Sequence, residues 1–577
     1  RPQAPTLASR PHRDRMLAEL LDAGIAVFRD TDKAVLLAAR SVGVDARLRR
    51  LDQDTLAACL GMLTPGQLWA PLSQEQARNL HWTERMGSTA WNVFHVFRLY
   101  AHEVDLERLR HALTLLAQEQ DLLRTRYVKV GDGHAQCVSE LVCVSLDAIS
   151  MDSSEAFHQF IQSRRSHPLL EEHGGPAIRM WLTEVDGAFQ LGLVAHHAHA
   201  DAFTPGLLFS QLMAQYGSLG SEAAARDDNR SWADQYWFYA LRQHDARGAS
   251  ADAHRAWWRD ALAGVEVEMR LPYRKEVTSS PSLRALATNQ IVPVSAELGE
   301  RIAELGREQG ISYPQLFAAV LAIVLRECFG NDRPVLQVIH NQRDSAALAA
   351  CLGDFSNVAF VPFELDPSRS VIDTLYAVRR VLLTALQHAR VPMADLFRIA
   401  GVDGHAGYGA MVGDVVLDSA DMDTANVNIA GEHGVSTYMN AVLEQRRIHF
   451  LDQALASLFF QFLRIDGRLY IFHAYRRALF EQETMQKLPQ LIVELADAML
   501  RAPDVPVADL IAAFGRRFDE LGRGARTLTM RDAPAAAVAG DSAALLERFL
   551  GGDLSIAQLR GALHPAGTRD GGRVVAE

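Results

Sequence analysis

The pattern of apolar and polar positions predicts a mixed α/β chain in which one polar cluster follows directly on a buried strand. Residues 189–195 (FQLGLVA) form a short, mostly apolar run, which is typical of a buried β-strand. Pro205 and Gly206 punctuate the chain, and residues 207–213 (LLFSQLM) begin a helix. The segment HHAHAD at 196–201 therefore lies in a strand-to-helix turn, a usual place for catalytic groups.

A second region with a clear pattern lies near the N-terminus. A helix is expected around residues 16–22, and two β-forming segments at 25–28 and 34–37 flank the Asp-rich connection 29–33, which is a hairpin signal. A further helix is expected over 54–60, with Asp52 or Asp54 as its cap. Together these elements predict a small module over residues 13–62.

The length of 577 residues exceeds what one hydrophobic core normally serves, so two or more globular units are expected. We expect a first lobe over 70–248, with a helix at 106–120, and a second over 249–503, with a helix at 313–328 and a strand at 335–339. Residues 504–577 are expected to form a flexible extension, because 533–540 are rich in Ala and Gly; a short amphipathic helix is expected within it at 541–550.

Charge and cysteine content narrow the class of protein. The net charge of −12 argues against a nucleic-acid binder, because phosphate contacts require clustered Lys and Arg. No apolar run reaches the roughly 18 residues that span a bilayer, and residues 1–7 contain no apolar leader. The five cysteines are scattered without CxxC spacing, which favours reduced thiols and a cytoplasmic protein.

The HHAHAD segment by itself allows three interpretations. It contains HHxxxD, formed by His196, His197 and Asp201, and it also contains HxHxD, part of a metallo-β-lactamase fingerprint. That fingerprint needs a further histidine after the aspartate, where this chain has Ala202, and this weakens the prediction of a metal-dependent hydrolase. The third interpretation is a polar turn whose histidines bind backbone carbonyls.

Further segments occur in the same order as the landmarks of one known family. The chain resembles the condensation domains of nonribosomal peptide synthetases, members of the HHxxxD acyltransferase superfamily, over about residues 70–500. This resemblance implies an α/β (α+β) two-lobed fold like that of chloramphenicol acetyltransferase. The segments are Leu72-Ser73, LRTRY at 123–127, the histidine motif, NQR at 341–343, GDFSN at 353–357 and HARVP at 388–392.

The resemblance also implies roles for the motif residues. An acyl chain would arrive as a thioester on the 4'-phosphopantetheine arm of a carrier protein, and His197 would take the proton from the attacking amine or hydroxyl. His196 would orient the turn, and Asp201 would pair with Arg343 as a structural brace. His199 occupies a variable position and is expected to be an ordinary core or surface histidine. No metal and no bound cofactor are expected, because the phosphopantetheine arm enters as substrate.

The module at 13–62 resembles the N-terminal β-hairpin docking domains of synthetase subunits. It would capture a tail of an upstream acyl or peptidyl carrier protein by adding it as a strand. The alternative is an N-terminal element packed permanently on the body.

No adenylation or carrier motif follows the condensation body, so we expect a free-standing enzyme of antibiotic biosynthesis that releases a polyketide or peptide as an ester or amide of a soluble acceptor. Condensation with a carrier-bound aminoacyl acceptor, an inactive carrier-recruiting module and a metal-dependent hydrolase remain as alternatives. Heterocyclisation is disfavoured, because the motif begins with two histidines.

Overall fold

The computed structural model describes most of the chain, and the statements below concern only the described residues. These are 10–22, 24–30, 33–38, 66–86, 92–99, 104–131, 133–140, 144–165, 169–170, 177–185, 187–219, 235–245, 249–277, 287–401, 415–421, 435–437, 456–465 and 467–528. The helices expected at 54–60 and 541–550 lie outside them.

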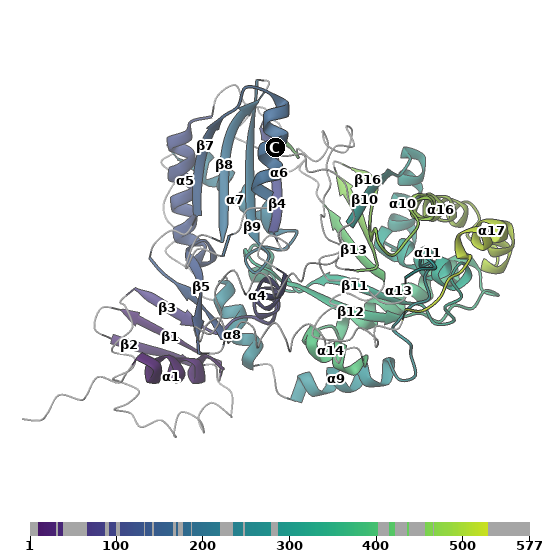
Figure 1. Cartoon of the computed structure of the whole chain (residues 1–577), viewed down its shortest axis with the longest axis horizontal. Coiled ribbons are helices and arrows are strands. Elements are labelled where there is room, and N and C mark those ends of the chain that lie inside the picture. The colour runs from purple at the N-terminus through teal and green to yellow at the C-terminus, as the bar shows by residue number, and fades with distance from the viewer. Residues whose placement is uncertain are drawn as a thin grey trace, which may run out of the picture.

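Two lobes make up the molecule (Figure 1). The N-terminal part contains α1 (Arg10–Asp22), β1 (Ile25–Asp30), β2 (Lys33–Ala38), β3 (Gln67–Ala70), α4 (Gln74–Met86), β4 (Asn92–Leu99), α5 (Leu106–Glu119), β5 (Thr125–Val130), β6 (Gly133–Val138), β7 (Val144–Ser150), α6 (Ser154–Arg165), β8 (Ile178–Val185), β9 (Ala188–His196), α7 (Thr204–Ser218) and α8 (Tyr236–Asp245). The C-terminal part contains α9 (Ala249–Ala261), β10 (Ala287–Pro293), α10 (Ala296–Gln309), α11 (Tyr313–Glu327), β11 (Val335–Asn341), α12 (Ala346–Ala349), β12 (Ser356–Pro362), α13 (Val371–Gln387), α14 (Met393–Ile399), β13 (Val415–Asp421), β14 (Val435–Thr437), β15 (Leu458–Ile465), β16 (Arg468–Arg476), α16 (Gln482–Arg501) and α17 (Val507–Gly522).

The main sheet of the first lobe carries the histidine segment at the end of one of its inner strands. Its order is β14-β4-β9-β8-β7. Apolar residues of α5 and α7 cover one face, and those of α6 cover the other, so β9 is buried on both sides as its continuous apolar run predicts. A Cβ atom on Gly192 would lie 2.1 Å from the Trp181 ring, so glycine is what allows this tryptophan to pack flat on β9.

The division between the lobes is less simple than the expected boundaries of 70–248 and 249–503. Strand β14 lies between β13 and β15 of the second lobe in the chain but pairs antiparallel with β4 of the first lobe. The division of the sequence into two consecutive lobes does not predict the pairing of β14 with β4. A three-residue strand has too short a hydrophobic pattern to be recognised from the sequence.

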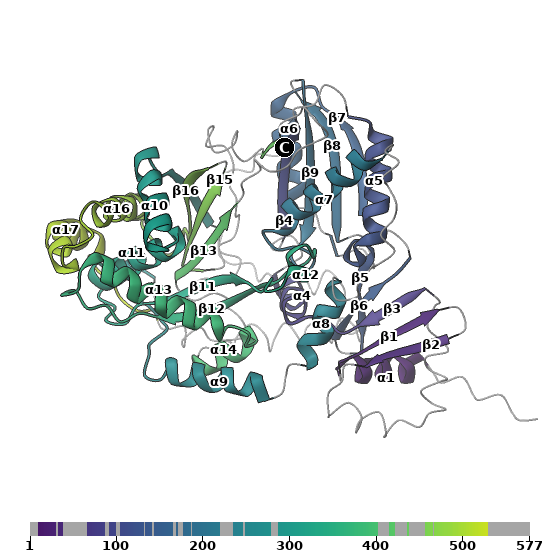
Figure 2. The same ribbon diagram turned by 180° about the vertical axis from the view of Figure 1, so that it is seen from behind.

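The second lobe is built on a six-stranded sheet with the order β10-β16-β15-β13-β11-β12. Helices α10, α11, α13 and α16 pack on one face of this sheet and form the largest core cluster. Figures 1 and 2 show these helices on the side away from the first lobe, so the other face of the sheet is turned toward it. Residues 415–421 form the central strand β13, which pairs parallel with both β11 and β15.

The N-terminal hairpin is present but is not a separate unit. β1 and β2 pair antiparallel from Ile25↔Ala38 to Asp30↔Lys33, as the two β-forming segments around the Asp-rich connection predict. β1 also pairs with β3, and β3 with β6, so the hairpin extends a sheet of the body in the order β2-β1-β3-β6-β5. The expected independent module over 13–62 therefore needs correction, because its sheet is shared with strands beyond residue 66.

The C-terminal extension also begins later than expected. Helix α17 packs Val507, Phe518 and Leu521 into the core of the second lobe, beside α11 and α16. The expected flexible segment at 504–577 is therefore wrong for residues 504–528, because an amphipathic helix with a buried face is part of the lobe.

Three of the five cysteines, Cys137, Cys328 and Cys351, are described; they are buried and form no disulfide. Among the helices that the structure describes, none is both long and apolar enough to cross a membrane alone; the bent pair of α10 and α11 passes that test only when taken together.

Candidate active site

The histidine motif lies where β9 ends and α7 begins. The backbone N–H of His199 donates to the carbonyl of His196 at 2.8 Å and closes the turn. Two residues of the 123–127 segment hold the turn from outside: the Tyr127 hydroxyl donates to the carbonyl of Ala198 at 2.6 Å, and the carbonyl of Thr125 accepts from Nε2 of His199 at 3.1 Å. This contact explains why the two sequence landmarks occur together.

Asp201 ties the start of α7 to the second lobe. Its Oδ1 accepts from the backbone N–H groups of Phe203 and Thr204 at 3.1 and 3.0 Å, which fixes the turn that leads into the helix. Its Oδ2 accepts from Arg343, and the two side chains are 3% and 8% exposed. The structure thus contains the ion pair that the resemblance implies, with nearly complete exclusion of water.

The Arg343 guanidinium makes other contacts as well. Nη2 donates to the carbonyls of Gly353 and Cys351 at 3.0 and 3.2 Å, and the guanidinium carbon lies 4.2 Å from the centroid of the Phe355 ring. A planar group with several donors is suited to such a site, and lysine could not replace it. Asp201 and Arg343 therefore fix the relative position of α7 and the 351–355 loop.

His196 and His199 are buried and neutral. Nδ1 of His196 accepts from the Ala198 N–H at 3.1 Å, so its proton resides on Nε2, which faces Thr83 Oγ1. Thr83 in turn donates to the carbonyl of Asn79 at 2.8 Å. Burial lowers the pKa of His196 to about 3 and that of His199 to about 4. Both residues support the turn rather than exchange protons near neutral pH.

Asp354 is the buried carboxylate around which the remaining groups gather. It belongs to the 353–357 segment, and its side chain is completely buried. Its Oδ2 accepts from Asn79 at 2.6 Å and from Arg78 at 3.0 Å, and its Oδ1 accepts from the backbone N–H of Ser356 at 2.9 Å. Helix α4 of the first lobe and strand β12 of the second therefore meet at this group.

His197 completes this arrangement. Its Nδ1 lies 3.4 Å from Oδ2 of Asp354, and its backbone carbonyl accepts from Asn79 at 3.1 Å. Burial alone would lower the pKa of His197, but the charge of Asp354 and its hydrogen bond outweigh burial, so the pKa lies above its ordinary value. Burial would raise the pKa of Asp354, yet His197 and Arg78 hold it at about 2.

This geometry suits a histidine that accepts a proton during a reaction. A proton on Nδ1 directed at Asp354 places the acceptor lone pair on Nε2, and the carboxylate stabilises the imidazolium that forms. The side chain of His197 is 28% exposed, so it can be reached, unlike the buried His196 and His199.

The HxHxD pattern does not assemble a metal site in the part of the chain that the structure describes. His197 faces Asp354, His199 faces Thr125, and Asp201 faces Arg343, so the three side chains diverge. Within the described residues, no three His, Cys, Asp or Glu side chains lie together as ligands. Ala202 is exposed at a bend beside the motif.

Sequence reasoning missed helix α4 and the role of Asp354. Arg78, Asn79 and Thr83 fall on one side of α4 at helical spacing, but a polar stripe on a helix ordinarily indicates a solvated face. Glu75 on the same helix also indicates that this side of α4 does not face solvent, because its side chain is buried. Burial raises the pKa of Glu75 to about 7, against the lowering effect of Arg78. Asp354 was visible within the 353–357 landmark, but nothing in a single sequence connects it to His197.

A cavity of about 580 Å³ lies between the lobes beside this site. Ser73, Glu75 and Arg78 line it from the first lobe, and Asn357 and Met393 line it from the second. Arg78, which lines it, also donates to Asp354, so the cavity lies one side chain away from the carboxylate that faces His197.

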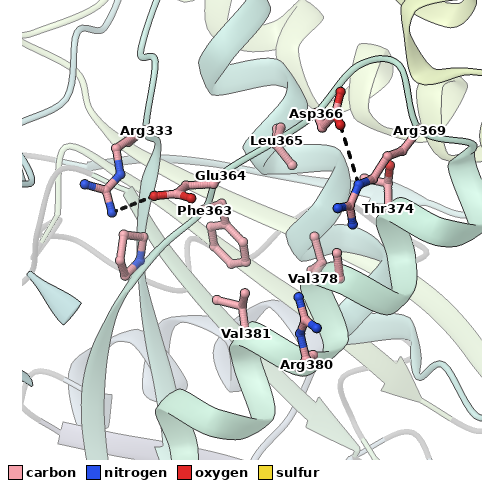
Figure 3. A pocket seen from close by; sticks show the side chains of 12 residues that line it. Arg333, Phe363, Glu364, Leu365, Asp366, Arg369, Thr374, Val378, Arg380 and Val381 are labelled. Atoms are coloured by element: carbon pink, nitrogen blue, oxygen red, sulfur yellow. Dashed lines mark ion pairs between the residues drawn. The ribbon is translucent and has the colours of Figure 1, made fainter. Parts of the chain in front are cut away.

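A second cavity, of about 340 Å³, lies in the second lobe (Figure 3). Its ion pairs are Arg333–Glu364 at 3.0 Å and Arg369–Asp366 at 3.6 Å. It begins at Pro362, at the end of β12 opposite to Ser356, which is about 20 Å away along an extended strand. It is therefore separate from the histidine site.

Comparison with known proteins identifies one family. The family model described as "Condensation domain" matches residues 67–514. Tyrocidine synthase 2 of Brevibacillus parabrevis is 23% identical over 472 residues, which cover 80% of this chain but only 12% of that protein. This chain thus spans about an eighth of the length of that relative.

Two solved structures share the fold over nearly their whole length. The condensation domain of the monacolin K polyketide synthase MokA aligns with a TM-score of 0.65 and 17% identity, covering 76% of this chain and 99% of that one. SgcC5 from Streptomyces globisporus aligns with a TM-score of 0.62 and 18% identity, covering 76% of this chain and 100% of that one.

The buried ion pair generates the first prediction. Arg343→Ala should destabilise the protein by about 3–5 kcal/mol, because it leaves the Asp201 carboxylate buried without its cation. Urea denaturation measures the change. Arg390→Ala is the matched control: its ion pair with Asp344 is exposed at 66% and 47%, so a change within about 1 kcal/mol is expected. Equal effects of the two substitutions would contradict the prediction.

The His197–Asp354 contact generates the second. Protonated His197 cannot accept a proton, so the rate should rise with pH through its pKa. Asp354→Asn removes the charge that raises this pKa, and the acid limb of the pH–rate profile should move to lower pH. The maximum rate should fall roughly tenfold or more, because the imidazolium loses its counter-charge.

Ser356→Ala is the control for this substitution. It removes a hydroxyl that hydrogen-bonds Asp354 but leaves the carboxylate facing His197, so the acid limb should stay in place. An unchanged limb in Asp354→Asn would show that Asp354 does not set the protonation of His197.

Proposed function

The chain belongs to the condensation-domain family of acyltransferases, and on that premise we propose that it transfers an acyl chain from a carrier-protein thioester to an amine or hydroxyl of a soluble acceptor, releasing the product as an amide or ester. Enzymes of this family form amide or ester bonds, act on phosphopantetheinyl-bound substrates and interact with carrier proteins. The identity of the acceptor as a soluble molecule is the part proposed here.

One observation carries the catalytic assignment: His197 combines accessibility with a buried carboxylate 3.4 Å from its Nδ1. We assign His197 as the group that acts on the acceptor, Asp354 as the residue that positions it, and His196, Asp201 and Arg343 as the residues that hold the turn. The two other histidines of the motif lack this combination, because both are buried and have lowered pKa values.

The reaction can be written with its protons balanced. The neutral acceptor attacks the thioester carbonyl carbon, its N–H or O–H proton passes to Nε2 of His197, and a tetrahedral intermediate forms. The intermediate collapses as the C–S bond breaks, and the proton on Nε2 passes to the departing thiolate of the phosphopantetheine arm. Asp354 stays ionised throughout and opposes the positive charge on His197 between these steps.

One similarity supports a small acceptor over a carrier-bound one. SgcC5, which this chain covers completely, was crystallised with (R)-(-)-1-(2-naphthyl)-1,2-ethanediol, a soluble diol. Condensation with a carrier-bound aminoacyl group is the second candidate, and the curated relatives that are synthetases favour it.

We also propose that the N-terminal hairpin docks the upstream carrier protein. β2 is the outermost strand of the sheet order β2-β1-β3-β6-β5, and an edge strand offers backbone donors and acceptors to an added peptide strand. A tail bound there would lie on the same sheet as β3, which leads directly into α4.

The transfer reaction is tested with an acyl-phosphopantetheine carrier protein, a panel of soluble amines and alcohols, and an aminoacyl carrier protein, with products followed by mass spectrometry. Wild type should acylate soluble acceptors, and His197→Ala should be slower by roughly 10²–10⁴-fold. His199→Gln serves as the control within the motif and should retain most of the rate if it remains folded. Transfer only to the aminoacyl carrier protein would favour the second candidate, and equal rates for wild type and His197→Ala would overturn the assignment.

The docking proposal is tested with proline substitutions at Val35 and Leu36 of β2. Neighbouring residues of a strand direct their N–H groups to opposite edges, so one of the two faces β1 and the other faces outward. The inward proline should lower the melting temperature. The outward one should leave the melting temperature unchanged and abolish binding of the carrier tail, measured by isothermal titration calorimetry. Intact tail binding by the stable variant would contradict strand addition.

A further inference from the structure

The face of the second-lobe sheet that its helices do not cover carries a carboxylate that the assigned reaction does not use. Asp418 lies on β13, the central strand, paired in register with Gln461 of β15. Paired residues point to the same face of a sheet, and residues two apart along a strand do so as well. By this rule Asp418 and Gln461 share their face with Phe472 of β16 and Ile291 of β10.

This face is the one turned toward the histidine site. The helix-covered face contains Leu458, Phe460 and Phe462, which alternate with Gln461 along β15 and belong to the main core. On the other face, Asn341 and Ser356 make contacts across to the first lobe: Asn341 Nδ2 lies 3.4 Å from Asp201 Oδ2, and Arg78 donates to Ser356 Oγ at 3.2 Å. Asp418 is thus on the wall opposite His197, and the charges of His197 and Asp201 both act on its pKa.

The hydrogen bonds of Asp418 leave its charge uncompensated. Among the described residues, Gln461 Nε2 donates to Oδ2 at 2.6 Å and the Ser419 N–H donates to Oδ1 at 2.8 Å, and both donors are neutral. A carboxylate can accept about four hydrogen bonds, so capacity remains on each oxygen. Burial raises the pKa of Asp418, so a positively charged partner would stabilise its ionised form. The side chains of both Asp418 and Gln461 are nonetheless partly exposed.

We propose that Asp418, oriented by Gln461, binds a positively charged nitrogen of the acceptor, distinct from the group that attacks the thioester. The inference rests on the proposed transfer to an acceptor and specifies the acceptor's class. A carboxylate that held the attacking group would keep an amine protonated and oppose its attack. A second nitrogen, which stays charged through the reaction, gains the full benefit of Asp418 in both ground and transition states. The acceptor is therefore a diamine or a basic amino alcohol.

The surroundings of Asp418 fit the remainder of such a molecule. Phe459, Ile291 and Tyr470 are half-buried on the same face and pack against Phe472, which is only 3% exposed. Methylene groups between two polar ends would pack on the half-buried side chains, while Asp418 holds one end and the other reaches His197. An acceptor that is uncharged at its far end would leave the half-buried carboxylate without a cationic partner.

The experiment compares linear diamines of two to six carbons with alkylamines and methoxyalkylamines of the same length, which share the attacking amine but are neutral at the far end. In wild type, at least one diamine should show a KM at least tenfold lower than its neutral counterparts. Asp418→Asn should abolish this difference by raising the diamine KM, with little change for the neutral amines. Asp418→Glu, which keeps the charge, should retain part of the preference.

Ser419→Ala is the matched control, because Ser419 is the neighbouring residue on the opposite face of β13. This variant should prefer diamines over neutral amines as strongly as wild type does. Thermal unfolding of each variant verifies that it is folded. The proposal is overturned if wild type does not distinguish diamines from neutral amines, or if Asp418→Asn lowers activity equally toward both.

Direct binding separates this inference from the proposed function. Calorimetric titration of the diamines into wild type and Asp418→Asn needs no turnover. Selective binding by wild type without any acyl transfer would uphold the Asp418 site and reject the transfer function. Acyl transfer with no preference for diamines, in either rates or binding, would uphold the transfer function and reject the Asp418 site.

Discussion

The exclusion of water from two aspartates at the lobe junction is the constraint on which the site depends. An ionised carboxylate cannot stay buried without partners, and for both Asp201 and Asp354 the cationic partner comes from the lobe that does not contain the aspartate. Asp201 of the first lobe requires Arg343 of the second, and Asp354 of the second requires Arg78 and Asn79 of the first. These charged contacts thus fix the position of one lobe relative to the other, and the position of His197 depends on them.

The same arrangement explains why neighbouring histidines behave differently. His196, His197 and His199 lie within four positions of one another, yet only His197 faces a carboxylate. His196 is held between an N–H group and a hydroxyl, and His199 against a carbonyl, so burial decides their protonation. The three residues are of the same type, and they differ in the groups that their ring nitrogens contact.

Local pattern and order along the chain were sufficient for much of the fold. The apolar run at 189–195 is β9, the expected hairpin is β1 and β2, and the 123–127 landmark supports the histidine turn through Tyr127. What could not be predicted depends on pairings between distant segments: β14 with β4, β1 with β3, and Asp354 with His197. A polar stripe such as that of α4 has the same pattern whether it faces solvent or another lobe, so the sequence could not show that it carries the site.

The pairing of β1 with β3 has a consequence for attempts to exchange N-terminal segments between related chains. A junction placed after β2 would divide a continuous sheet, exposing the backbone edge of β3 and the apolar side chains that α1 covers, which include Val130 and Ala135. Just three residues separate β3 from α4, so the disturbed strand adjoins the helix that holds Asp354. In this protein the hairpin therefore cannot be exchanged alone. A chimera that preserves activity must retain the complementary surface of β3 and β6 along with the hairpin.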